Sequence, residues 1–267
     1  MTSTGPIEWR EDRVFVAEAG VQLLRIGSGR PLLLLHGSGG NRAYLSYQEE
    51  LAKHYEVLAP SHPGFGTSDL PPWLETVPDT ACFYLWMLEE MGLEGIDVIG
   101  FSLGGWIAAE MSVMCPKVFN RLVLVGSAGL KPAQAEMTDI FLISGPEVLE
   151  KMFYDPKQAP EYDKFFGTEP TPEHRELAER NREMAARLTW KPYMHDPRLT
   201  GLLPRIKSRV LLLWGRQDAL IPLECGELYQ AALPNARLKV IEECGHSPQY
   251  EKPREFNSIV LDFLREE

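Results

Sequence analysis

The sequence predicts an α/β fold in which a mostly parallel central sheet is flanked by helices. Short apolar runs alternate with longer segments of helical periodicity, as in successive β-α-β units. The run Pro31–Leu35 is too continuously apolar for a half-exposed strand and too short for a helix, so it fits a strand buried on both faces. A parallel sheet covered by helices on both sides follows from these two observations.

The expected elements alternate along most of the chain. Two N-terminal strands meet near Ala19 and Gly20 as a hairpin-like pair, and the central strands follow. In order, the expected strands are residues 13–18, 21–26, 31–35, 56–60, 96–101, 121–125, 209–214 and 236–242. The expected helices of the sheet domain are residues 44–54, 77–91, 103–115, 223–233 and 254–265.

One long segment interrupts this alternation. From about residue 130 to residue 203 the chain lacks strand signals and is rich in proline, charge and aromatic side chains, and residues 172–188 have an amphipathic helical pattern. We therefore expect one sheet domain in two parts, residues 1–129 and 204–267, with a helical unit inserted at residues 130–203.

Composition narrows the class of protein. The chain has 267 residues, 44% of them hydrophobic and 24% charged, which is ordinary for a globular protein. A formal charge of −11 without a basic cluster argues against nucleic acid or a membrane surface as partner. The N-terminus has no signal-peptide pattern and no run is long enough to span a membrane, so we expect a cytoplasmic protein, monomer or homodimer.

Neither a metal nor an organic cofactor is expected. The cysteines have no metal-ligand or disulfide spacing and are interpreted as reduced, mostly buried core residues; they are Cys82, Cys115, Cys225 and Cys244. The histidines at positions 54, 62, 174 and 195 also lack metal-site spacing.

Ser102 lies between Gly100 and Gly104, where an apolar run meets a helical pattern. A serine hydroxyl is a weak nucleophile, and a tight strand-to-helix turn exposes it to a base and to a substrate. The five-residue pattern is weak by itself, because a serine that caps a helix N-terminus produces the same letters.

Two more reactive side chains follow later strands. Asp218 comes after the strand expected at residues 209–214, and His246 comes after the last one. Alone, Asp218 could be a turn residue and His246 an exposed loop residue. However, the carboxyl ends of parallel strands share one edge of the sheet, and a serine needs a basic histidine that a carboxylate orients. Together with Ser102 they predict a catalytic triad.

These residues belong to a set of motifs that resembles the α/β-hydrolase superfamily over nearly the whole chain. The motifs are His36-Gly37, Pro63-Gly64-Phe65-Gly66-x-Ser68-Asp69, Gly100-x-Ser102-x-Gly104-Gly105, Trp214-Gly215-x-x-Asp218 and Gly245-His246. The resemblance implies that Ser102 is the nucleophile, His246 the general base and Asp218 the orienting acid. It also implies an oxyanion hole from the backbone N–H groups of Ser38 and Leu103, and a helical cap at residues 130–203.

Other polar residues are given structural roles. Asp97 lies at the wrong end of its strand for catalysis, and Asp69 is expected to brace a glycine-rich turn. His36 is interpreted as a brace for the turn that follows it. Some relatives carry the acid after the sixth strand, but here Gly126-Ser127-Ala128 offers no carboxylate.

The substrate class is argued from the same resemblance. Related dehalogenases and epoxide hydrolases use aspartate where this chain has Ser102, so acyl transfer is favoured. The turn at residues 36–40 and the compact cap are similar to meta-cleavage-product hydrolases, which cut carbon-carbon bonds of ring-fission products. Those enzymes usually have asparagine before the serine and tryptophan after the histidine, whereas this chain has Phe101 and Ser247.

We therefore expect a carboxylesterase for small or aryl esters. The alternatives are a carbon-carbon hydrolase of the meta-cleavage type, a lactonase or perhydrolase, and a non-enzymatic receptor or scaffold. The cap arginines at positions 180, 182 and 187 could bind an anionic substrate, but interleaved glutamates favour a solvated, salt-bridged face. The pocket should be apolar, and the candidates to line it are Phe101, Trp106, Phe141, Phe153 and Trp190.

Overall fold

The computed structural model describes residues 8–167 and 169–266, which form an eight-stranded sheet in the order β1-β2-β4-β3-β5-β6-β7-β8. The pairs β1/β2 and β2/β4 are antiparallel, and every other neighbouring pair is parallel. The predicted fold class is therefore confirmed. The strands are β1 (Arg10–Val16), β2 (Ala19–Gly27), β3 (Pro31–Leu35), β4 (Glu56–Pro60), β5 (Ile96–Phe101), β6 (Phe119–Val125), β7 (Arg209–Gly215) and β8 (Ala236–Ile241).

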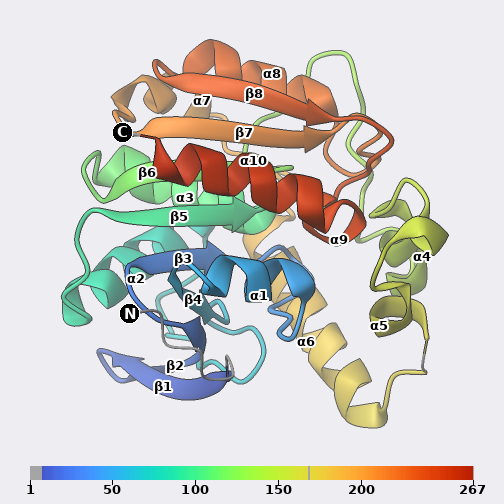
Figure 1. Ribbon diagram of the computed structural model, residues 1–267. Helices are drawn as coiled ribbons and strands as arrows, with labels where there is room; N and C mark the ends of the chain where they lie inside the picture. The colour runs from blue at the N-terminus through green and yellow to red at the C-terminus, as the bar shows by residue number, and fades with distance from the viewer. Residues whose placement is uncertain (1–7, 168, 267) are drawn as a thin grey trace.

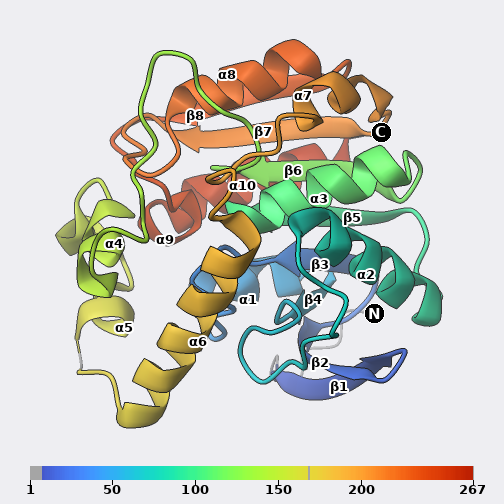
Figure 2. The same cartoon turned by 180° about the vertical axis from the view of Figure 1, so that it is seen from behind.

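Helices cover both faces of this sheet. Figure 1 shows α1 and α10 on the near face, and Figure 2 shows α2, α3 and α8 on the other. These helices are α1 (Ser46–Ala52), α2 (Val77–Glu90), α3 (Leu103–Met114), α8 (Leu223–Ala232) and α10 (Pro253–Arg265). The N-terminus of α2 is closed by a capping box, in which Thr76 and Asp79 bind each other's backbone N–H groups.

The central strands are apolar throughout because both of their faces are buried. Successive side chains of a strand point to opposite faces, so Leu33 and Leu35 join the core under α2, α3 and α8. Leu32 and Leu34 join the second core under α1 and α10. Each such side chain contributes about 1.5–3 kcal/mol of transfer free energy, which fixes the sheet as the rigid base of the molecule.

Between β6 and β7 the chain leaves the sheet and forms helices beside the carboxyl ends of the strands (Figure 1). They are α4 (Gly145–Lys151), the 3-10 turn η1 (Pro156–Gln158), α5 (Tyr162–Phe166) and α6 (Pro172–Thr189). Thr171 caps α6 by accepting the His174 N–H, and proline occupies the first position of that helix. We call the segment from Leu130 to His195 the cap.

The base of the cap is closed by backbone pairing. The Gly129 N–H donates to Met194 O at 2.9 Å, and the Asp196 N–H donates to Gly129 O at 3.0 Å. The following helix α7 (Leu199–Leu202) and turn η2 (Leu203–Arg205) pack against α3 and α8 with Leu199 and Leu203 fully buried. Residues 199–205 thus pack on helices of the sheet domain, and the cap boundary expected at residue 203 stays a prediction.

The cysteine prediction is partly wrong. All four cysteines are free, and Cys225 and Cys244 are buried, but Cys82 and Cys115 are exposed. Cys82 lies on the outer side of α2, and Cys115 follows the last residue of α3. Within residues 8–167 and 169–266, no helix is both long and apolar enough to cross a membrane.

Candidate active site

Ser102 stands at a strained turn between β5 and α3. Its φ is +51° and its ψ is −113°, a conformation that a residue with a Cβ rarely adopts. The flanking glycines are sterically required, because a Cβ added at Gly100 would lie 2.5 Å from Gly104 O and one added at Gly104 would lie 2.1 Å from Leu35 O. The Ser102 side chain makes no capping hydrogen bond, so the turn presents the hydroxyl instead of using it to start α3.

Asp218 and His246 form a buried pair. His246 Nδ1 lies 2.7 Å from Asp218 Oδ2, while Asp218 Oδ1 accepts the N–H groups of Leu220 and Ile221 at 2.9 Å each. A carboxylate can only accept, so the proton of the histidine must lie on Nδ1. The Nε2 lone pair is then free to take a proton, as a general base requires. Asp218 is thus both a turn residue and the partner of His246.

The turn after β6 brings the serine and this pair together. Ser102 N–H donates to Val125 O at 2.9 Å, and Ala128 N–H donates to Ser102 O at 3.2 Å. Between these two bonds Gly126 has a φ of +50°, and a Cβ on it would lie 3.0 Å from His246 Nδ1. The same backbone turn therefore touches the nucleophile candidate on one side and the acid-base pair on the other.

Two unpaired backbone donors flank Ser102. A Cβ added at Gly37 would lie 3.3 Å from Ser102 Cβ and 4.0 Å from its Oγ, so the turn at residues 37–40 borders the hydroxyl. Among the described residues, neither the Ser38 N–H nor the Leu103 N–H has a hydrogen-bond partner. Donors in this arrangement suit an oxyanion that forms next to the serine.

His36 braces that turn, as the sequence analysis predicted. Its Nδ1 donates to Gly37 O at 2.7 Å, and its Nε2 accepts the His62 N–H at 2.9 Å. His62 Nε2 donates back to His36 O at 2.8 Å, and the Tyr84 hydroxyl lies 2.7 Å from His62 Nδ1. Burial lowers the pKa of His36 to about 4, and burial together with the neighbouring His36 lowers the pKa of His62 well below its usual value. Both rings are therefore neutral and serve the turn.

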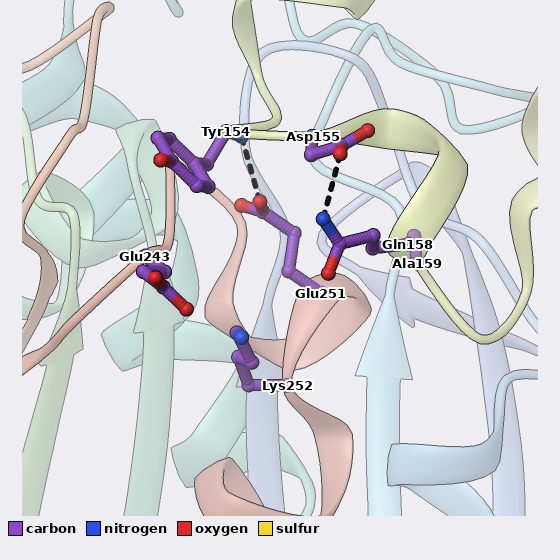
Figure 3. Close-up of a pocket in the computed structure, with 7 residues that line it drawn as sticks. All are labelled: Tyr154, Asp155, Gln158, Ala159, Glu243, Glu251 and Lys252. Atoms are coloured by element: carbon purple, nitrogen blue, oxygen red, sulfur yellow. Dashed lines mark hydrogen bonds between the residues drawn. The ribbon is translucent and has the colours of Figure 1, made fainter.

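Glu251, in the short helix α9 (Pro248–Glu251), is a buried residue that sequence reasoning missed. One oxygen accepts the Gly245 N–H at 2.8 Å and the other accepts the Tyr154 N–H of the cap at 2.7 Å; Figure 3 shows the second bond. Burial raises the pKa of this carboxyl. The residue thus joins the cap to the loop that carries His246. The polar and charged residues around it, such as Gln249, Lys252 and Arg254, gave the sequence no signal that this glutamate is buried.

The expected pocket residues lie in different surroundings. Trp106 is 3% exposed, donates to Glu110 and packs against Gly129. Its place in the substrate pocket stays a prediction. Phe141 and Trp190 form a ring pair on the cap, and Trp190 is 53% exposed.

Phe101 and Phe153 are buried parts of one aromatic cluster. Phe101 lies 5.8 Å from Tyr47 between ring centroids, Tyr47 lies 6.0 Å from Tyr250, and Tyr250 lies 6.5 Å from Phe153. The cluster extends from the residue before Ser102 into the cap. Its tyrosines were not among the expected site residues, since tyrosines at these spacings fit a helix core equally well.

The expectation that the cap arginines form a solvated face paired with glutamates is wrong for two of them. Arg180 donates to the backbone carbonyls of Gly64 and Ser68, and Arg182 donates to those of Phe141 and Ile143. The long side chains cross to neighbouring segments instead of pairing with glutamates along α6. Arg187 is exposed, as expected for a solvated face.

The remaining acidic residues are structural, as predicted. Asp69 accepts from Arg13 and from the Gly20 N–H, and Asp97 is fully buried and pairs with Arg30. The described part of the chain contains no cluster of three or more metal-ligating side chains.

Comparisons with known proteins identify the family of this chain. Residues 32–259 match the family model described as Alpha/beta hydrolase family. The chain belongs to the alpha/beta hydrolase family. It is a hydrolase by that membership.

Two curated relatives of this hydrolase are enzymes of one kind. It is similar to a 2-hydroxy-6-oxo-6-phenylhexa-2,4-dienoate hydrolase of Comamonas testosteroni, with 29% identity over 90% of this chain and 89% of the relative. It is also similar to a 2-hydroxymuconate semialdehyde hydrolase of a Pseudomonas species, strain CF600, with 30% identity over 90% of this chain and 88% of the relative.

Solved structures share the fold. A 2-hydroxy-6-oxo-6-phenylhexa-2,4-dienoate hydrolase from Rhodococcus strain RHA1 superposes with a TM-score of 0.80 at 24% identity, covering 97% of this chain and 100% of that one. A membrane phospholipase A superposes with a TM-score of 0.76 at 26% identity, covering 96% of this chain and 86% of that one.

Proposed function

We propose that this hydrolase uses Ser102 as nucleophile, His246 as general base and Asp218 as the orienting acid. The observation that carries the proposal is the buried Asp218–His246 bond of 2.7 Å beside a serine held at a φ of +51°. Proton transfer from Ser102 to His246 Nε2 creates an imidazolium that the Asp218 carboxylate stabilises. The serine oxygen can then attack a carbonyl carbon.

The attack produces a tetrahedral alkoxide. The free N–H groups of Ser38 and Leu103 are suited to bind this oxygen, and one such donor contributes a factor of about 10²–10³ to the rate in other enzymes. Collapse of the intermediate breaks the bond to the leaving group, which takes its proton from His246. Water, activated by the same histidine, then releases the acyl group from Ser102.

For the bond that breaks, we propose a carbon-carbon bond beside a ketone. The substrate named for the 29% identical relative, a 2-hydroxy-6-oxo-6-phenylhexa-2,4-dienoate, contains no ester or amide. Hydrolysis of such a molecule must therefore cleave the chain next to the 6-oxo carbon. The leaving carbon needs conjugation to a second carbonyl, and His246 would protonate it. These relatives support the carbon-carbon alternative more directly than the esterase expectation.

Ester hydrolysis is the second candidate, and the surroundings of Ser102 favour it. A dienoate carries a carboxylate, but Arg180 and Arg182 already bind backbone carbonyls. Phe101, next to the serine, is buried against Tyr47 and Phe256 and offers no polar group. An uncharged ester or lactone suits these side chains. The 26% identical phospholipase A structure also supports ester hydrolysis, because a phospholipase A cleaves an ester bond.

A labelling experiment tests the shared mechanism. A fluorophosphonate should label the wild type and the control Ser112→Ala, whose hydroxyl binds Ala108 O within α3, but not Ser102→Ala. The Ser102→Ala change should lower kcat by about 10⁴-fold or more. If the wild type is neither labelled nor active on any substrate, the nucleophile proposal is wrong and the receptor or scaffold alternative is supported.

A substrate panel separates the two bond types. We expect kcat/KM for a 2-hydroxy-6-oxo dienoate to exceed that for p-nitrophenyl acetate and butyrate by about 100-fold, a difference of roughly 3 kcal/mol in transition-state stabilisation. The opposite ratio would assign the protein to the ester hydrolases.

A further inference from the structure

A residue of the cap reaches the turn that carries the proposed oxyanion donor. Asn181 on α6 is 9% exposed. Its Nδ2 donates to Gly39 O at 3.1 Å, and its Oδ1 accepts the Gly66 N–H at 2.9 Å. Building on the proposed function, we propose that Asn181 is a positioning residue through which the cap sets the geometry of the oxyanion hole.

The turn has one internal backbone hydrogen bond, from the Gly40 N–H to Gly37 O at 3.1 Å, and its other supports come from outside it. Gly37, Gly39 and Gly40 flank or follow Ser38, and glycines have little conformational preference of their own. A Cβ added at Gly39 would meet nothing within 4 Å, so this part of the turn is not held by packing. Gly37 borders Ser102, whereas Gly39 is held by Asn181. The Ser38 N–H therefore lies between a residue fixed by the nucleophile and a residue fixed by the cap.

The fit between α6 and the turn is close. Gly40 has a φ of +90°, and a Cβ on it would lie 2.2 Å from Asn181 Nδ2. The amide also spans two loops, because Gly66 belongs to the segment after β4 that includes His62. Since His62 supports the same turn through His36, the turn is held by α6 on one side and by the His36–His62 pair on the other.

The neighbouring Arg180 provides a matched control. It also lies on α6 and makes two hydrogen bonds to backbone groups, here as the donor in both, at 3.0 Å to Gly64 O and 2.8 Å to Ser68 O. It makes no hydrogen bond to residues 37–40. Loss of Arg180 thus removes cap-to-core bonds of the same kind without releasing the Ser38 segment.

Asn181→Asp tests the donor with almost no change in shape. The aspartate can still accept the Gly66 N–H, but it places an oxygen against Gly39 O and should displace the turn. Oxyanion contacts strengthen in the transition state, so kcat should fall about 10- to 100-fold while KM changes less than about threefold. Arg180→Ala should keep kcat within about threefold of the wild type.

A tetrahedral inhibitor gives a readout that a merely structural role would not change. Phenylboronic acid bonded to Ser102 places an oxygen in the oxyanion hole, so its affinity should fall in parallel with kcat for Asn181→Asp and for Asn181→Ala, and should stay unchanged for Arg180→Ala. Circular dichroism checks that each variant folds. If Asn181→Asp does not fold, the comparison is made with Asn181→Ala.

Two results would overturn the inference: unchanged kcat and boronate affinity in both Asn181 variants, or an equal loss in Arg180→Ala. Failure of the proposed function has a different signature, because the wild type itself would then neither react with a fluorophosphonate nor bind the boronate.

Discussion

Gly126 follows β6 directly, with a φ of +50° and with the His246–Asp218 pair against it. A Cβ there would lie 3.0 Å from His246 Nδ1 and 3.3 Å from Asp218 Oδ2, closer than most real Cβ contacts. The absence of a side chain at this position therefore leaves room for an acid that comes from the end of β7.

We expect Gly126→Ala to impair both stability and turnover. The left-handed backbone should cost about 1–2 kcal/mol, and displacement of the imidazole should lower kcat at least about 10-fold. Urea unfolding and steady-state kinetics measure the two effects. Gly145→Ala is the control, because a Cβ at Gly145 meets nothing within 4 Å. A Gly126→Ala protein with normal kcat would show that the pair tolerates the contact.

For single residues, the sequence predicts those that the order of the strands brings together. It does not predict which neighbouring segment a side chain on a helix will contact. Ser102, Asp218 and His246 each follow the carboxyl end of a strand, so strand order alone brings them to one edge of the sheet. Arg180 was misjudged, because a helical pattern does not say which neighbouring segment a long cationic side chain will reach.

The short helix α9 shows how one element links two parts of the molecule. Pro248 starts it and Glu251 ends it, and the carboxylate of Glu251 holds the Gly245 and Tyr154 N–H groups. A Cβ at Gly245 would lie 2.8 Å from Met152 O, so the cap backbone packs directly on the His246 loop. A helix of four residues has no detectable periodicity, which is why the sequence did not predict it.

Glu251→Gln should loosen this link. A glutamine has only one acceptor oxygen, so one of the two N–H groups would face an NH₂ group. An unsatisfied buried donor costs about 1–3 kcal/mol, which should outweigh the relief of desolvation that follows loss of the buried charge. We expect a lower unfolding free energy and faster hydrogen exchange at Gly245 or Tyr154.

The exposed Glu255, at the start of α10, is the control for that change. Glu255→Gln should alter the unfolding free energy by no more than about 0.5 kcal/mol. Equal exchange rates in wild type and Glu251→Gln would mean that packing at Gly245, and not the carboxylate, joins the cap to the loop.

For the whole molecule, the sheet and the long helix α6 were predictable from the sequence, and the short helices of the cap were not. Strands such as Pro31–Leu35 are apolar because helices cover both of their faces. Burial on both faces thus produces a continuous apolar run that can be recognised in the sequence. The cap has short helices, α4 and α5, with no fully buried face of their own. Their positions depend on contacts with the core that no local pattern encodes.

The stability of the whole molecule should depend on pH through His36 and His62. Both are buried and neutral, and their pKa values lie below 6.5, the ordinary value for histidine. As pH falls below 6.5, these histidines bind protons in the unfolded chain but stay neutral in the folded chain, so the free energy of unfolding decreases. For His36 alone, a pKa lowered from 6.5 to about 4 corresponds to roughly 3 kcal/mol lost by pH 4.

Urea unfolding between pH 7 and pH 4.5 checks this expectation. Burial raises the pKa of Asp97, Glu110 and Glu251, so protonation of these carboxyls relieves a destabilisation as pH falls and offsets part of the loss. Asp69 has a lowered pKa and loses its stabilising effect only below about pH 4, outside this window. Replacement of the exposed His54 by glutamine should leave the slope unchanged. A constant unfolding free energy over this range would contradict the prediction that the two histidines dominate the pH dependence.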